Sequence, residues 1–189
     1  MARRRAETNP MEKQMKLNKI EAGSAFPSLT ATSLEGEAVD ISTPSNGADW
    51  KMVVVYRGRH CPLCTKYLNN LENFAARLAD IGVDLVAVSG DSGEQLKEHL
   101  ERLEVSFPLF HGLSIEQMQS LGLYVSYPRS EKETDHPFPE PGLFVINDQR
   151  GVQVVDISNN PFVRPEPEAL TSGLEWIRQN DYPIRGTYP

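Results

Sequence analysis

The chain has 189 residues, enough for one domain with short appendages, and it carries a formal net charge of −7. This acidic balance argues against a general nucleic-acid binder, which needs a basic face. The sequence contains no run of about 18 apolar residues, so no membrane-spanning helix is predicted. No apolar segment follows Arg3–Arg5 to complete a signal peptide. We therefore expect a cytoplasmic protein whose partners include neither nucleic acid nor membrane.

A flexible arm and a hairpin are expected before the core. Residues 1–18 are expected to form a flexible N-terminal arm, because chain termini are commonly mobile. Residues 28–33 and 37–41 flank a Glu-Gly pair and predict an N-terminal β-hairpin. One domain is expected over residues 19–180, followed by a C-terminal tail over 181–189.

The predicted core begins with a strand, a long helix and a second strand. Continuous apolar runs over 52–56 and 83–88 are typical of strands covered on both faces. A helix over about 62–80 is predicted by gaps of three and four between its apolar residues, which are Leu68, Leu71, Phe74, Ala75 and Leu78. A strand, a helix and a strand in this order form a βαβ unit, which implies parallel strands and a right-handed crossover.

Shorter elements are predicted in the second half of the chain. Helix starts are marked by two capping boxes and a proline: Ser92 with Gln95, Ser114 with Gln117, and Pro167. The first of these helices is expected to carry a leucine stripe, namely Leu96, Leu100 and Leu103. Strands are predicted over 107–110, 143–146 and 152–155, the last two forming a hairpin. Residues 124–141 are rich in proline and charge and predict a structureless loop. The order indicates an α/β domain with a mixed central β-sheet flanked by helices on both faces.

Both cysteines of the chain, Cys61 and Cys64, lie where the first buried strand ends and the long helix begins. We expect both within the first turn of that helix. The first turn of a helix offers free backbone N–H groups and the positive end of the helix dipole, which favour thiolate over thiol. Three basic residues add positive charge nearby: Arg57, Arg59 and Lys66. Because the thiolate is the nucleophile, we predict that Cys61 attacks and that Cys64 closes a redox-active disulfide. Cys61 is expected to be the more exposed of the two, and Cys64 to be shielded around Leu68.

The residues around the pair have both functional and structural interpretations. His60 is expected either to stabilise a thiolate as imidazolium or to cover the site. Pro62 fits the first helical turn, where its missing N–H costs nothing. Tyr56 and Tyr67 are better explained by packing in the core than by lining the site.

Other chemistry for the cysteine pair is disfavoured. A structural zinc site would need two more ligands, and the remaining histidines are scattered: His99, His111 and His136. Haem attachment requires a histidine directly after the second cysteine, where Thr65 stands. We therefore expect no metal and no other cofactor. Two inert buried cysteines remain an alternative interpretation.

Three segments carry a family resemblance: Glu21–Pro27 with its Gly-x-x-x-Pro pattern, Val53–Cys64, and Gly142–Asn147. With them, the chain resembles the alkyl hydroperoxide reductase / thiol-specific antioxidant (AhpC/TSA) family, the peroxiredoxin-like branch of the thioredoxin-fold superfamily. The resemblance spans about residues 20–178, nearly a whole domain. It implies a thioredoxin-like fold with an N-terminal β-hairpin, and antioxidant chemistry.

The site departs from the family's Pro-x-x-x-Thr-x-x-Cys pattern. If Cys64 takes the register of the attacking cysteine, Cys61 replaces the threonine and Arg57 replaces the proline. The arginine that usually precedes the late strand in the family is replaced by Pro141, which resembles the cis-proline facing the CxxC pair of thioredoxins. If that likeness holds, we expect a cis Glu140–Pro141 bond opposite Cys61.

The combined expectation is a thiol-dependent antioxidant oxidoreductase that reduces peroxides through a Cys61/Cys64 dithiol–disulfide cycle. The alternatives are a thioredoxin-like thiol–disulfide oxidoreductase without peroxidase activity and a non-enzymatic redox-sensing or binding module that uses residues 124–141. The implied partners are a peroxide or protein disulfide as substrate and a thioredoxin- or glutathione-type reductant. A homodimer is compatible with this interpretation.

Overall fold

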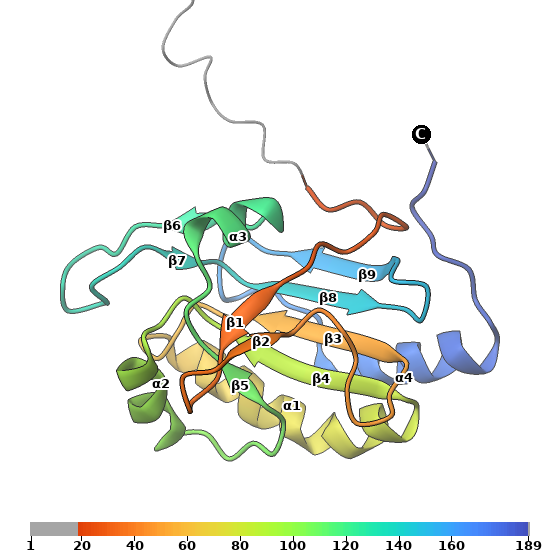
Figure 1. Ribbon diagram of the computed structural model, residues 1–189, viewed down its shortest axis with the longest axis horizontal. Helices are drawn as coiled ribbons and strands as arrows, with labels where there is room; N and C mark the ends of the chain where they lie inside the picture. Colours follow the sequence, from red (N-terminus) through yellow and green to blue (C-terminus); the bar gives the residue numbers. More distant parts are fainter. Residues whose placement is uncertain (1–18, 189) are drawn as a thin grey trace, which may run out of the picture.

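The computed structural model describes residues 19–188, so the predicted arm over 1–18 lies outside the described residues. A mixed five-stranded sheet in the order β5-β4-β3-β8-β9 forms the centre of the fold (Figure 1). Its strands are β3 (Trp50–Val55), β4 (Val83–Val88), β5 (Leu109–Phe110), β8 (Gly142–Ile146) and β9 (Val152–Ile157). β3 pairs in parallel with β4 and antiparallel with β8, which confirms the predicted mixed sheet.

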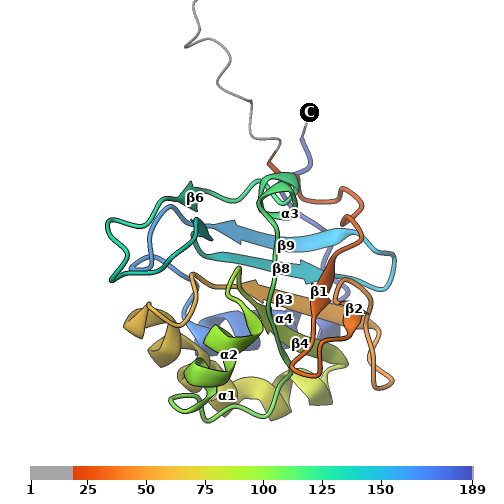
Figure 2. The ribbon, with the colours of Figure 1, turned by 60° about the vertical axis from the view of Figure 1, so that its left-hand side comes forward.

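Helices and a hairpin cover the two faces of this sheet. The helices are α1 (Pro62–Asp80), α2 (Gly93–Leu100), α3 (Ile115–Ser120) and α4 (Pro167–Gln179). Buried residues of α1, α2 and α4 form one core with the sheet, whereas α3 packs on the opposite face. On that opposite face lies the predicted N-terminal hairpin, formed by β1 (Thr30–Thr32) and β2 (Ala38–Asp40) (Figure 2).

The alternation of side chains along β3 divides the apolar residues between two cores. Met52 and Val54 point into the core that contains Leu68 of α1. Val53 and Val55 point into the second core, beside the hairpin. Because both faces are buried, the strand needs apolar residues at successive positions, and this produces the continuous run seen in the sequence.

A buried ion pair interrupts the apolar centre of the sheet. Lys51 of β3 and Asp84 of β4 are paired neighbours, and Lys51 Nζ lies 2.8 Å from Asp84 Oδ2. The same carboxylate accepts hydrogen bonds from the backbone N–H and hydroxyl of Ser45, at 2.8 and 2.7 Å. Each of the two charges therefore has an oppositely charged partner inside the fold, as buried charges require.

Residues 124–141 are more ordered than predicted. They contain β6 (Val125–Ser126) and β7 (Phe138–Pro139), which pair antiparallel, so the expectation of a structureless loop was wrong. Strands of two residues are too short to show an alternation of apolar and polar residues in the sequence. The segment is held in place by the buried Phe138 and by a hydrogen bond from Glu140 N to Tyr124 O (2.8 Å). α2 is also shorter than its leucine stripe suggested, because it ends at Leu100 and a turn carries Leu103.

The first and last described segments meet beside the β8–β9 turn. Gly23 N donates to Val152 O at 2.8 Å, and Val152 N donates to Ser24 O at 2.9 Å. A Cβ at Gly23 would lie 3.1 Å from Thr187 Cγ2, so the tail packs directly on this glycine. Within the described residues, no helix is long and apolar enough to cross a membrane.

Candidate active site

The loop between β3 and α1 is shaped by one glycine and one buried carboxylate. Gly58 has φ of 128°, a conformation that side chains rarely adopt, and a Cβ there would collide with the carboxylate of Asp91. Asp91 follows β4 and accepts a hydrogen bond from Arg59 N at 2.7 Å. The ends of the two parallel strands thus fix the backbone that leads to the cysteines.

Cys61 forms the N-cap of α1, and Pro62 occupies its first turn. The Cys61 sulfur accepts hydrogen bonds from the backbone N–H of Cys64 (3.2 Å) and from the Cys64 thiol (Sγ–Sγ 2.6 Å). The predicted helix over 62–80 is confirmed, but Cys61 precedes it rather than lying within its first turn. This is the position in which a side-chain acceptor satisfies a free N–H of the helix terminus.

The two thiols have opposite acid–base character. The hydrogen bond from the Cys64 thiol, helped by the Cys64 N–H and by the charges of Arg164 and Arg57, lowers the pKa of Cys61 to about 6 despite its burial. Burial raises the pKa of Cys64 well above its ordinary value, and donation to Cys61 raises it further. The pair therefore holds one negative charge on Cys61 and one proton on Cys64.

Neither sulfur is openly exposed. Cys61 is 2% exposed and Cys64 is 0% exposed. Cys61 is the more exposed of the two cysteines, as predicted, but it is a buried residue and not the accessible one that was expected. Its position at the cap, between the apolar core and the loop from β3, accounts for this burial.

Arg164 is a site residue that sequence reasoning missed. It lies between β9 and α4, and its Nη2 donates to Cys64 Sγ at 2.9 Å. Its guanidinium lies 4.9 Å from the ring centroid of Tyr67, whose hydroxyl donates to Pro165 O at 3.1 Å. The separation of 100 residues from Cys64 hides the contact from any local motif. The absence of an arginine before the late strand was the one signal that could have prompted a search for a substitute.

The segment 124–141 supplies the partners of Arg57. The guanidinium of Arg57 lies 3.4 Å from Glu140 and 3.6 Å from Glu133, and 4.6 Å from the centroid of the Phe138 ring. These contacts hold the arginine close enough to Cys61 for its charge to favour the thiolate. The segment thus helps to build the site.

The other predicted basic neighbours turn away from the sulfurs. Arg59 pairs with Glu98 of α2 at 2.9 Å, and Lys66 is exposed on α1. His60 packs its ring 4.5 Å from that of Phe138, and burial and the charge of Arg57 lower its pKa to about 4. His60 is therefore neutral near physiological pH, which fits a cover over the site and not an imidazolium.

Pro141 does not have the predicted cis conformation. No cis peptide bond occurs among residues 19–188, so the Glu140–Pro141 bond is trans and the prediction was wrong. The backbone runs extended from β7 into β8, and Pro141 O accepts a hydrogen bond from Ser158 N at 3.0 Å. Pro141 still lies near the site, where it lines a small internal cavity with Arg164.

The remaining aromatic and histidine residues pack around the pair. Tyr56 is fully buried, its ring lies 5.6 Å from that of His99, and burial raises its pKa. Burial lowers the pKa of His99 to about 4, and its Nε2 lies 2.8 Å from the hydroxyl of Thr65. Among the residues that the structure describes, no cluster of three or more His, Cys, Asp or Glu side chains could hold a metal ion.

Comparison with known proteins places this geometry in a family. The model of the AhpC/TSA family matches residues 22–155. The chain belongs to the AhpC/TSA family. Its membership supports thiol-dependent oxidoreductase chemistry in general and confirms the resemblance seen in the sequence. Among curated proteins, none matches the chain significantly.

Solved structures show the same fold at low sequence identity. A cysteine-to-serine mutant of peroxiredoxin 6 from Arenicola marina aligns with a TM-score of 0.70 at 17% identity, covering 86% of this chain and 76% of its own. Peroxidoxin BcpB from Mycobacterium tuberculosis aligns with a TM-score of 0.67 at 17% identity, covering 85% and 98%. AhpC of the same organism gives 0.66 at 14% identity, covering 85% and 99%. These likenesses confirm the thioredoxin-like α/β fold of this AhpC/TSA chain.

Proposed function

We propose that the protein is a thiol-dependent peroxidase in which Cys61 attacks and Cys64 resolves. The observation that carries the proposal is the pair of hydrogen bonds that Cys61 Sγ receives from the N–H and S–H of Cys64. They stabilise negative charge on one sulfur while the other keeps its proton. One helical turn thus supplies both a nucleophile and a second thiol, which is the minimum that a dithiol cycle needs.

The cycle has one oxidation by peroxide, one condensation that forms the disulfide, and one reductive step. The Cys61 thiolate attacks the terminal oxygen of a hydroperoxide; the O–O bond breaks, and the departing alkoxide or hydroxide takes a proton from solvent. The product is a sulfenic acid on Cys61. The Cys64 sulfur then attacks the Cys61 sulfur, the S–O bond breaks, water leaves, and a disulfide forms. A thioredoxin- or glutathione-type reductant returns two electrons and two protons.

The test is a titration of the reduced protein with hydrogen peroxide, with free thiols counted by mass spectrometry. One equivalent should consume both thiols of the wild type. Cys61→Ser should consume no peroxide, whereas Cys64→Ser should stop at a sulfenic acid on Cys61 that dimedone traps. A sulfenic acid on Cys64 in Cys61→Ser would reverse the two roles.

A protein disulfide is the alternative substrate, because a thiolate displaces a sulfur from a disulfide by the same kind of attack. The observation that favours it is the CxxC spacing, with both sulfurs in contact at the start of α1. Turnover with a reductant decides between the candidates. A peroxidase consumes many equivalents of peroxide, a disulfide reductase consumes only the disulfide, and a redox sensor stops after one equivalent.

A further inference from the structure

We propose that Arg164 stabilises Cys64 as the leaving thiolate when the Cys61–Cys64 disulfide is reduced, and thereby directs the incoming reductant to Cys61. The inference rests on the proposed dithiol–disulfide cycle and concerns its reductive half. It makes Arg164 a catalytic residue, because its guanidinium touches a sulfur that changes its bonding.

The position of Arg164 is fixed from two sides. Its Nη2 lies 2.9 Å from Cys64 Sγ, and its guanidinium carbon lies 4.9 Å from the centroid of the Tyr67 ring. The Tyr67 hydroxyl donates to Pro165 O, so the aromatic ring and the loop that carries the arginine are tied together. Cys64 and Tyr67 both belong to α1, and one rigid helix therefore sets both contacts.

The charge of Arg164 lacks a carboxylate partner. The ion pairs of the described residues engage other arginines, including Arg57 and Arg59, but none engages Arg164. Its Nε and Nη1 are buried and have no hydrogen-bond partner. Arg164 is half-buried, and a partly desolvated cation without a carboxylate partner is stabilised by a neighbouring anion. The sulfur of Cys64 is the contacting atom that can take up a negative charge during the reaction.

In the reduced protein this charge sits on Cys61, and Cys64 keeps its proton. The situation reverses when the disulfide opens. A reductant thiolate attacks Cys61, a new S–S bond forms there, the Cys61–Cys64 bond breaks, and Cys64 departs with the electron pair. Cys61 is then neutral, and without Arg164 the new thiolate on Cys64 would be an unpaired buried anion. Because a more stable leaving thiolate departs faster, Arg164 accelerates this step.

Attack at the other sulfur is disfavoured by access. Both cysteines are buried, but the Cys64 sulfur has the guanidinium of Arg164 against it, whereas Cys61 lies at the helix cap, beside the loop from β3. A reductant that approached Cys64 would have to displace Arg164, while one that approached Cys61 leaves it in place. The geometry therefore favours attack of the reductant on Cys61, with Cys64 as the leaving group.

The test starts from protein oxidised with diamide, so that the disulfide forms without peroxide. Glutathione is then added, the reaction is stopped by acid and alkylation, and tandem mass spectrometry locates the glutathione. The wild type should carry it on Cys61. Arg164→Gln should slow the opening about tenfold or more, and Arg164→Lys, which keeps the charge, should recover part of that loss.

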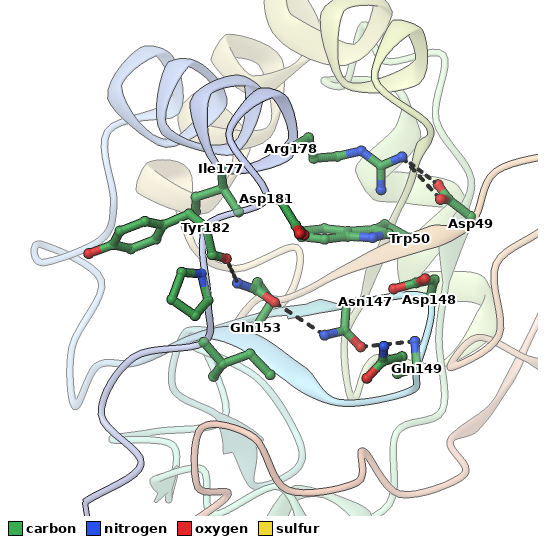
Figure 3. Close-up of a pocket in the computed structure, with 12 residues that line it drawn as sticks. Asp49, Trp50, Asn147, Asp148, Gln149, Gln153, Ile177, Arg178, Asp181 and Tyr182 are labelled. Atoms are coloured by element: carbon green, nitrogen blue, oxygen red, sulfur yellow. Dashed lines mark hydrogen bonds and ion pairs between the residues drawn. The ribbon is translucent and has the colours of Figure 1, made fainter.

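Arg178 offers a matched control at the other end of β3. Its guanidinium lies 4.8 Å from the Trp50 ring centroid, as Arg164 lies over Tyr67, and it pairs with Asp49 (Figure 3). In Arg178→Gln, the Cys61–Cys64 disulfide should open at the wild-type rate.

Two results would overturn the inference: glutathione on Cys64 in the wild type, or an unchanged rate in a folded Arg164→Gln. Circular dichroism establishes the folding of that variant. If it does not fold, the rate of Arg164→Lys and the position of glutathione in the wild type decide. If the diamide-formed disulfide opens as described but the protein consumes no peroxide, the proposed peroxidase activity fails and the role of Arg164 stands.

Discussion

At the scale of single residues, the reactivity of Cys61 depends on a neighbour that is itself a cysteine. The Cys64 thiol is the largest influence that lowers the pKa of Cys61, ahead of the backbone N–H and the two arginines. In the proposed cycle, Cys64 thus acts before its own chemical step, as a hydrogen-bond donor to Cys61. Substitution of Cys64 can separate its two roles. Alanine removes both the hydrogen-bond donor and the reactive thiol, whereas serine keeps a donor and removes only the thiol chemistry.

Replacing Cys64 should shift the titration of Cys61. In the wild type, the rate of alkylation by iodoacetamide should rise with pH through about 6, because the thiolate forms there. In Cys64→Ala the midpoint should move up toward the ordinary value of 9.0, because the donor is lost. Cys64→Ser, whose hydroxyl can still donate, should shift it less. An unmoved midpoint in Cys64→Ala would mean that the helix N–H and the arginines hold the charge alone.

Gly58 should tolerate no side chain. Gly58→Ala places a Cβ against the Asp91 carboxylate and demands a φ of 128° from an L-residue, so the loop before Cys61 must shift. We expect a loss of about 1–3 kcal/mol in unfolding free energy from the strain, together with slower oxidation of Cys61. Urea unfolding and peroxide titration measure the two effects. Gly36→Ala is the control, because its φ of 88° imposes strain in open space, away from the site.

At the scale of elements, the site is assembled where β3 and β4 end side by side. Parallel pairing of the two strands brings the loop after Val55 next to the loop after Val88, and Asp91 then binds Arg59 N. The sequence revealed this pairing through its two apolar runs, because strands buried on both faces allow few polar residues. The sequence could not reveal β6 and β7, because strands of two residues are too short to show an alternation of apolar and polar residues.

The buried pair between these strands should show strong coupling. Asp84→Ala leaves Lys51 without a partner inside the sheet and should cost about 3–5 kcal/mol of unfolding free energy. The double variant Lys51→Met with Asp84→Leu should cost clearly less than the single one, since no charge is then buried. Denaturant unfolding of both variants checks this, with the exposed Glu98→Ala, expected to change stability little, as the reference. Equal losses in the single and double variants would contradict it.

At the scale of the whole molecule, the candidate site draws on segments from across the chain. The cysteines come from the start of α1, Arg57 from the loop before it, and Arg164 from the connection to α4. Local patterns identified the cysteines and Arg57 because capping and helix-start rules act within a few residues. Arg164 could not be found in this way, because only the completed fold brings it within 2.9 Å of Cys64 Sγ.

The buried histidines should make the molecule sensitive to acid. The folded-state pKa values of His60 and His99 are about 4, below the ordinary value of 6.5, because burial disfavours the charged rings. Stability is therefore fully present above about pH 6.5 and is lost as the pH falls toward 4, where the unfolded chain binds the protons first. His60→Phe keeps a ring against Phe138 and removes one of these groups. Its urea midpoint should fall less than that of the wild type between about pH 7 and about pH 5; an equal fall would contradict the assignment.

The contact between the two ends of the described chain has a mechanical consequence. Gly23 touches both Val152 and Thr187, at the end of the sheet opposite the cysteine pair, because the β3–β8 register places Val55 beside Gly142 and Lys51 beside Ile146. A pulling force applied through the two ends would break the hydrogen bonds of Gly23 and Ser24 with Val152 one after another. The central strands would bear the load only after these bonds had broken. The contact between the two ends therefore lies at the end of the sheet opposite the cysteine pair, so its loss would leave the strands beside the cysteines in place.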